Sequence, residues 1–152
     1  MIFMLIDPTA ALIKSTQDFH RHSIKSDLIS AALKQVARVR QRFWSAITHS
    51  DIGLGANLGA GLNLPHPNGV IIHEEAVIGC NTMIMQQVTI GITDKGGPPH
   101  IGADVYIGAG AKVLGKVSIG DGARIGANAV VLCDVPARST AVGVPAKIVH
   151  KI

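Results

Sequence analysis

The chain has 152 residues, and its formal net charge of +4 arises within residues 1–50, which carry seven Lys or Arg against three Asp or Glu. Aromatic residues make up 3% and charged residues 16%, which excludes a disordered chain and predicts a core of small and branched aliphatic side chains. All 17 glycines lie after residue 50. We therefore expect an N-terminal segment over residues 1–50 and a different, glycine-rich domain over residues 51–152.

The chain shows no disulfide framework and no membrane segment. Its two cysteines, Cys80 and Cys133, are too few for such a framework, and neither has a second cysteine at metal-ligand spacing. The apolar run Met1–Ile6 is interrupted by Asp7 and Pro8 and is too short for a signal-peptide core or a bilayer span. These features predict a cytoplasmic protein without stable membrane insertion.

The N-terminal segment predicts two helices. Asp7 followed by Pro8 is typical of an N-cap with proline in the first helical position, and predicts a short helix to about His20. Residues 27–47 contain neither glycine nor proline and predict a second helix. Its apolar residues recur at helical spacing at Ile29, Leu33, Val36, Phe43 and Ile47.

The second predicted helix also carries a basic edge. Lys34, Arg38 and Arg42 lie four residues apart, with Trp44 nearby. A basic stripe beside an aromatic residue suits a membrane surface or a nucleic acid, but three charges make a thin footprint for a nucleic-acid binder. We interpret the edge as the solvated face of a docking helix and expect no nucleic-acid partner.

Residues 51–152 repeat with a period of six, which matches neither a helix nor a two-residue strand alternation. Such a period predicts a solenoid of triangular coils, each side a short strand with one inward aliphatic residue. The segment can be written as thirteen lines of about six residues, each of which opens with an aliphatic residue. In eight of these lines glycine follows the opening residue, and we expect it to supply corner conformations. The residues that open the lines are Ile52, Leu58, Leu64, Ile72, Ile78, Ile84, Ile90, Ile101, Ile107, Val113, Ile119, Ile125 and Val131.

Two insertions, residues 65–69 and 93–99, interrupt the six-residue phase. Irregular insertions in a regular scaffold are where function is usually placed. The first insertion holds His66 between two prolines, which restrict the loop, and histidine is the natural general base near neutral pH. Asp51 precedes His66 by fifteen residues, close to one coil, so we expect the two residues to be neighbours in space.

The repeat resembles the hexapeptide-repeat acyltransferases, whose fold is a left-handed parallel β-helix and whose members are generally trimers. Within them, residues 45–150 are most similar to serine acetyltransferases and to the short O-acetyltransferases of polysaccharide gene sets. The resemblance is carried by the motifs His66-x-x-Gly69, Gln86-Gln-Val-Thr-Ile-Gly91 and Val142-Gly-Val-Pro-Ala-Lys-Ile148.

The resemblance implies acetyl transfer from acetyl-CoA, as co-substrate, to a hydroxyl, with no metal and with active sites between the subunits of a homotrimer. It matches His66 to the catalytic base and Asp51 to the residue that orients it. The implied cofactor-binding residues are Gly91, Ala109, Ala127 and Lys147, and the candidate acceptor-binding residues are Asn68, Gln86 and His100. With the helical segment cut to about fifty residues, a simple trimer is expected, because a larger helical domain pairs the trimers of typical serine acetyltransferases.

At two positions the chain departs from the usual serine acetyltransferase pattern. The acceptor can therefore be L-serine or a related hydroxyl compound, or instead a sugar or polysaccharide precursor. Pro65 stands where serine acetyltransferases usually carry Asp, and Gly-Gly-Pro-Pro precedes His100 where they usually carry an Arg-His pair. Two other classes remain as alternatives. One is a zinc hydratase that uses His66, His73 and His100, and the other is an inactive trimeric scaffold.

Overall fold

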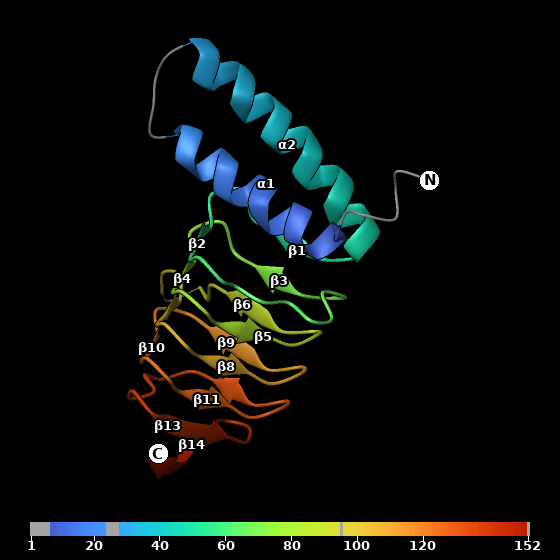
Figure 1. Cartoon of the computed structure of the whole chain (residues 1–152). Coiled ribbons are helices and arrows are strands. Elements are labelled where there is room, and N and C mark those ends of the chain that lie inside the picture. Colours follow the sequence, from blue (N-terminus) through green and yellow to red (C-terminus); the bar gives the residue numbers. More distant parts are fainter. Residues whose placement is uncertain (1–6, 24–27, 95, 152) are drawn as a thin grey trace.

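A helical hairpin sits on one end of a β-prism (Figure 1). The computed structural model describes residues 7–23, 28–94 and 96–151, so the apolar run Met1–Ile6 lies outside the described residues. Helix α1 is Pro8–Ser23 and helix α2 is Leu28–Thr48. Among the described helices, none is long and apolar enough to cross a membrane.

Helix α1 begins where the sequence predicted and rests on the first coil of the prism. The backbone N–H of Thr9 donates to Oδ1 of Asp7 at 2.8 Å, which is the N-cap bond expected ahead of a proline in the first helical position. Leu12 is fully buried, and the side-chain amide of Gln17 donates to the Leu58 carbonyl at 3.1 Å. The helix ends at Ser23, three residues beyond the predicted end.

The remaining chain forms three sheets whose strands stack along the prism, and this confirms the predicted parallel β-helix. Sheet A has the order β1-β3-β6-β9-β12, sheet B has β2-β4-β7-β10, and sheet C has β5-β8-β11-β13-β14. Every strand pair is parallel except β13 with β14. The strands are β1 Asp51–Ile52, β2 Asn57–Leu58, β3 Ile71–Ile72, β4 Val77–Ile78, β5 Met83–Ile84, β6 Thr89–Gly91, β7 His100–Ile101, β8 Tyr106–Ile107, β9 Lys112–Leu114, β10 Ser118–Ile119, β11 Arg124–Ile125, β12 Val130–Val131, β13 Ser139–Val142 and β14 Lys147–Lys151.

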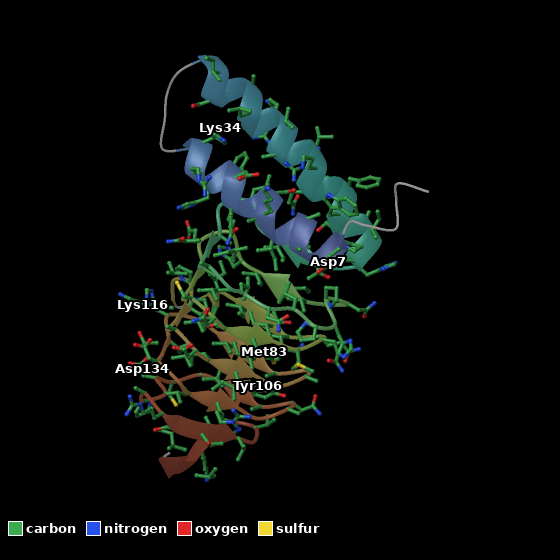
Figure 2. All side chains as sticks on the ribbon, viewed as in Figure 1. Asp7, Lys34, Met83, Tyr106, Lys116 and Asp134 are labelled. Carbon is green, nitrogen blue, oxygen red and sulfur yellow. The ribbon has the colours of Figure 1, made fainter. Side chains whose placement is uncertain are left out.

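The core of the prism consists of the residues that open the six-residue lines. None of these thirteen aliphatic side chains is more than 6% exposed. Successive residues of a strand point to opposite sides of the sheet, so the neighbours of the line-opening residues lie outside. Met83 and Tyr106, which are register partners in sheet C, mark that outer surface in Figure 2. The narrow interior explains the scarcity of aromatic residues.

The glycines in the second place of the lines serve a purpose other than the predicted one. None of these eight glycines has a positive φ. A Cβ on Gly108 would instead lie 2.6 Å from the backbone nitrogen of Ala127 in the next coil. The left-handed corner conformation falls on other residues, such as Gln87 (φ 59°) and Asn128 (φ 56°). Close stacking of the coils therefore requires seven of the eight glycines, the exception being Gly91, where the nearest atom would lie at 3.6 Å. The predicted corner role was wrong.

Helix α2 packs against the rest of the protein through a different side from the one on which its regularly spaced apolar residues lie. The buried residues of α2 are Ser30, Ala37, Gln41, Trp44 and Thr48. Gln41 donates from its side-chain amide to the Ile52 carbonyl at 2.7 Å and so ties α2 to β1. The exposed large apolar residues of α2 are Ile29, Leu33, Val36, Val39, Phe43 and Ile47. The apolar face of α2 thus remains uncovered within the described chain.

Candidate active site

His66 lies on a loop that both the prism core and the end of α2 hold in place. The loop starts after Leu64 and returns at Val70, and both of these side chains are buried. The backbone N–H of Gly69 donates to the His49 carbonyl at 2.7 Å, and the N–H of Val70 donates to the Pro67 carbonyl at 3.1 Å. The His66 side chain itself is exposed. The loop therefore presents an imidazole to solvent from a fixed backbone.

A hollow of about 370 Å³ opens beside His66, between the helical hairpin and the loop. The helices supply one wall and the loop supplies the other. Apart from His49 and His66, no ionisable side chain lines this hollow among the described residues. The lining residues are Pro8, Thr9, Ile47, Thr48, His49, Pro65, His66, Pro67 and Asn68. The helical segment therefore forms part of the candidate site.

His49 is a member of this hollow that the sequence did not reveal. It follows α2 directly, its φ is 53°, and its side chain is exposed. A lone histidine between a helix and a repeat carries no motif. Only the folded chain shows that His49 and His66 line the same hollow.

Asp51 lies close to the loop through its backbone, but its carboxylate does not contact His66. Its backbone N–H donates to the Val70 carbonyl at 2.8 Å, where the loop rejoins the prism. Its exposed side chain lines a separate hollow of about 290 Å³ beside Arg42 and Ser45. Within the described chain, no side-chain hydrogen bond joins Asp51 to His66. The predicted proximity of the two positions is found, but a contact between the two groups is not.

Four predicted site residues stack in a single column along one edge of the prism. This edge, where the chain passes from sheet C to sheet A, is called here the first edge, and it also carries the His66 loop. The column, called the corner ladder, consists of Asn68, Gln86, Ala109 and Ala127 in successive coils. The Gln87, Gly110 and Asn128 N–H groups donate to the carbonyls of Asn68, Gln86 and Ala109 at 3.0, 2.9 and 2.8 Å.

The corner ladder leaves backbone donors free for a ligand. Within the described residues, the N–H groups of Ala109 and Ala127 have no backbone acceptor. Ala127 is exposed and Ala109 is half-buried. A ligand that lies along the first edge and has amide carbonyls would satisfy both donors.

Lys147 lies at the far end of the prism, where β14 folds back on β13. It pairs with Val142, whose side chain approaches Gly126 in the coil above. The turn before Lys147 is fixed by hydrogen bonds from the Val130 N–H to the Gly143 carbonyl at 3.0 Å and from the Ala146 N–H to the Val130 carbonyl at 2.8 Å. The Lys147 side chain is exposed. It supplies a cation beyond the last step of the corner ladder.

Gly91 and His100 do not join His66 within one chain. Gly91 ends β6 at the second edge, where the chain passes from sheet A to sheet B. His100 begins β7 on sheet B, with its side chain exposed, and pairs with Val77 and Ser118. The insertion at residues 93–99 also leaves from the second edge. Within one protomer, Gly91 and His100 therefore lie at the second edge, whereas His66 lies at the first edge.

The three histidines considered for zinc do not form a cluster. The described residues contain no group of three His, Cys, Asp or Glu side chains that could hold a metal ion. His73 instead accepts a hydrogen bond at Nδ1 from the Glu75 N–H at 3.2 Å. The geometry of one chain therefore offers no support for a three-histidine zinc site.

Comparison with known proteins assigns the family. Residues 98–133 match the family described as bacterial transferase hexapeptide (six repeats). The chain is 45% identical over 133 residues to the serine acetyltransferase of Helicobacter pylori (strain J99 / ATCC 700824), covering 86% of this chain and 74% of that protein. The chain belongs to the serine acetyltransferase family.

Solved structures of this family superpose on the whole fold. Soybean serine acetyltransferase complexed with serine matches with a TM-score of 0.81 and 38% identity, covering 95% of this chain and 58% of the soybean chain. A serine acetyltransferase in complex with CoA matches with a TM-score of 0.80 and 38% identity, covering 95% of this chain and 58% of that chain. This member of the serine acetyltransferase family thus spans little more than half of each of these solved relatives.

Proposed function

We propose that the protein is an acetyl-CoA-dependent O-acetyltransferase that acts on the hydroxyl of L-serine or a related small compound. The observation that carries the proposal is the first edge itself. A fixed histidine stands at one end, free backbone donors follow along the corner ladder, and a lysine stands at the other end. The relatives complexed with serine and with CoA support both substrates.

In the proposed mechanism, His66 takes the proton of the acceptor hydroxyl as general base. The hydroxyl oxygen attacks the thioester carbonyl, and backbone N–H donors stabilise the oxyanion of the tetrahedral intermediate. The carbon–sulfur bond then breaks, and the CoA thiolate recovers a proton from the imidazolium of His66. The transfer is direct, so it requires no covalent enzyme intermediate.

The corner ladder suits the pantetheine arm of CoA. That arm is a thin chain with amide groups, and the N–H groups of Ala109 and Ala127 are unpaired along the first edge. Lys147, beyond the end of the ladder, is placed to meet a CoA phosphate. We assign these three residues to the CoA side of the site.

We propose that the complete site forms between subunits of a homotrimer. The first and second edges are the two borders of sheet A, because the chain enters and leaves sheet A at them. Three prisms with sheet A turned to a common threefold axis bring the first edge of each against the second edge of its neighbour. This arrangement would place Gly91 and His100 of one subunit beside His66 of the next.

A sugar hydroxyl is the second candidate acceptor, and the lining of the hollow favours it. The charged groups of serine call for a carboxylate and a cationic partner, yet the lining offers only the two histidines as ionisable groups within one chain. Pro65 occupies the position before the proposed base, where it provides no charge.

The deciding experiment is an acceptor panel. CoA release would be followed with a thiol reagent, with L-serine and sugar hydroxyls compared side by side at matched concentrations. Acetyl-CoA turnover that depends on either acceptor supports the proposal, and the preferred acceptor selects between the two candidates. A chain that releases no CoA above the hydrolytic background with any acceptor would instead be the inactive scaffold.

A further inference from the structure

A ladder of backbone hydrogen bonds runs along the third edge of the prism, where the chain passes from sheet B to sheet C. At each step, a residue with positive φ donates its N–H to a carbonyl of the preceding coil. The N–H groups of Asn81, Asp104, Gly122 and Arg138 donate to the carbonyls of Ala60, Cys80, Ala103 and Asp121, each at 2.8 Å. Gly61 holds the same place in the first coil, with a φ of 72°. No coil precedes it, and its N–H has no acceptor within the described residues. The ladder therefore begins with a free donor.

The first edge begins differently, because its ladder is capped. Gly69 holds the place there that Gly61 holds at the third edge, and its φ is 69°. Its N–H donates to the His49 carbonyl at 2.7 Å, so the end of α2 supplies the acceptor that a preceding coil would supply. Nothing in the described chain does the same for Gly61. A backbone N–H without an acceptor calls for a ligand oxygen or water.

The N–H of Gly61 opens on a hollow of about 730 Å³ that is called here the α1 pocket. Helix α1, which crosses the end of the prism above β2 in Figure 1, forms one wall, and residues between 57 and 62 of the first coil form the other. Each lower donor of the ladder points back toward the preceding coil, so the Gly61 N–H points toward α1. The buried side chains of Ile13, Leu58 and Leu62 give the pocket an apolar floor. A volume of this size suits a small organic molecule.

The ionisable side chains of the α1 pocket all come from α1 and carry an excess of positive charge. They are Lys14, Asp18, His20 and Arg21. The Asp18 carboxylate pairs with the Arg40 guanidinium of α2 at 3.7 Å, so its charge is compensated from outside the pocket. Lys14 and Arg21 are exposed and have no acidic partner within the described residues. They lie two turns apart on the same side of the helix, about 10 Å along its axis.

These donors together select an anionic group with several oxygens. The helix dipole accounts for Arg21 in the last turn of α1, but not for Lys14 two turns earlier. A phosphate ester offers three strong acceptor oxygens, one for each cation and one for the Gly61 N–H, whereas a carboxylate offers two. We propose that the α1 pocket binds an organic phosphate. Its phosphate meets Lys14, Arg21 and the Gly61 N–H, and its apolar body lies over Ile13 and Leu62.

This site is separate from the proposed acetyl transfer. The α1 pocket and the hollow beside His66 share no lining residue. The third edge lies opposite sheet A, so a trimer with sheet A turned to its axis leaves the pocket open. The organic phosphate is therefore a second ligand of the protein, beside the acceptor and acetyl-CoA.

The first test is isothermal titration calorimetry of the purified full chain with 1-naphthyl phosphate. We expect one molecule to bind per chain. Inorganic phosphate lacks the apolar body and 1-naphthoate carries a carboxylate in place of the phosphate, so each should bind about 5-fold or more weakly. A chain that does not bind 1-naphthyl phosphate overturns the proposal. Equal affinity for either of the other two probes overturns it as well.

Substitutions locate the bound probe. Lys14→Gln and Arg21→Gln should each weaken the binding of 1-naphthyl phosphate by about 5- to 20-fold, because each removes a charge-assisted hydrogen bond. Both side chains are exposed, so the fold should persist, and circular dichroism verifies the helices. Lys116→Gln, an exposed lysine at the second edge, should keep the wild-type affinity. If Lys147→Gln weakens binding and Lys14→Gln does not, the probe occupies the proposed CoA site and the proposal fails.

The second test follows the Gly61 donor directly by nuclear magnetic resonance. A chain labelled with ¹⁵N only at its 17 glycines gives one amide signal for each of them. When 1-naphthyl phosphate binds, the Gly61 amide proton should move downfield and exchange more slowly with solvent, whereas the Gly69 amide, already bonded to His49, should stay unchanged. A probe that leaves the Gly61 signal in place would overturn the proposal. Because no measurement uses acetyl-CoA, the result is independent of the proposed activity.

Discussion

The backbone N–H of Gly69 donates to the carbonyl of His49 at 2.7 Å, and this bond joins the loop of the proposed base to the end of α2. Both residues have positive φ, 69° and 53°. The glycine adopts this conformation without cost, whereas His49 is held in it by the chain around it. The helical hairpin and the His66 loop therefore line one hollow from two sides, and the helical segment contributes to the candidate site.

His66→Ala should lower kcat by about 10²- to 10⁴-fold, because it removes the proposed general base. The side chain is exposed, so the melting temperature should stay within about 2 °C of the wild type. Steady-state assays of CoA release measure the first effect and thermal denaturation measures the second. His20→Ala on α1 is the matched control. Full activity of His66→Ala would eliminate this residue as the base.

If the Asp51 carboxylate turns from its own hollow to the His66 loop when substrates bind, Asp51→Asn should lower kcat by roughly 10-fold while the KM for acetyl-CoA stays unchanged, because the charge that orients His66 would be lost. The substitution keeps the size of the side chain and removes only its charge. Activity should recover in Asp51→Glu if charge is what matters. An Asp51→Asn enzyme that keeps its kcat and loses acceptor affinity would place Asp51 in acceptor binding instead.

Ala127→Leu should raise the KM for acetyl-CoA by about 10-fold or more, because a larger side chain covers the free backbone donors on the corner ladder. Ala137→Leu is a close control. Each alanine is exposed and precedes a left-handed residue, Asn128 (φ 56°) in one case and Arg138 (φ 53°) in the other. Ala137 lies on a different edge. Equal effects of the two substitutions would count against CoA binding along the first edge.

Lys147→Ala should raise the KM for acetyl-CoA by roughly 3- to 10-fold with little change in kcat, since an exposed lysine contributes a modest charge contact with a phosphate. Salt screens such contacts, so the difference from wild type should shrink between 0.05 and about 0.5 M NaCl. Lys116→Ala, at a position labelled in Figure 2, serves as the charge-matched control. A salt-independent difference would contradict an electrostatic role.

Gly108→Ala should destabilise the fold by about 1–3 kcal/mol, because the new Cβ would meet the next coil at close range. The nearest atom, the backbone nitrogen of Ala127, lies 2.6 Å away and cannot move without shifting that coil. Gly97→Ala should be neutral, since nothing lies within 4 Å of the added atom. Thermal denaturation should therefore separate the two variants by several degrees. Equal melting temperatures would show that the coils can separate.

Much of the fold could be predicted from the six-residue repeat, because each inward position of the prism requires a buried aliphatic residue. For that reason the line-opening residues, from Ile52 to Val131, are all buried as predicted. The same pattern located the two insertions and singled out His66. It did not reveal why glycine holds the second place, since the contact between Gly108 and Ala127 joins residues one coil apart.

Helix α2 shows the limit of periodicity as evidence. The spacing of Ile29, Leu33 and Val36 identified an apolar side correctly, but the helix docks through Ala37 and Trp44 instead. Hydrophobic spacing shows which side of a helix avoids water. It does not show whether the residues that bury that side belong to the same chain.

The sequence by itself determined the prism, its core and the position of His66, because the period of six and the two phase breaks are local properties of the chain. The tertiary structure alone decided that His49 shares the hollow of His66, that Asn68, Gln86, Ala109 and Ala127 form one column, and that Gly91 and His100 stand on another edge. Those relationships depend on how coils stack and where edges fall, so they arise between residues far apart in the sequence.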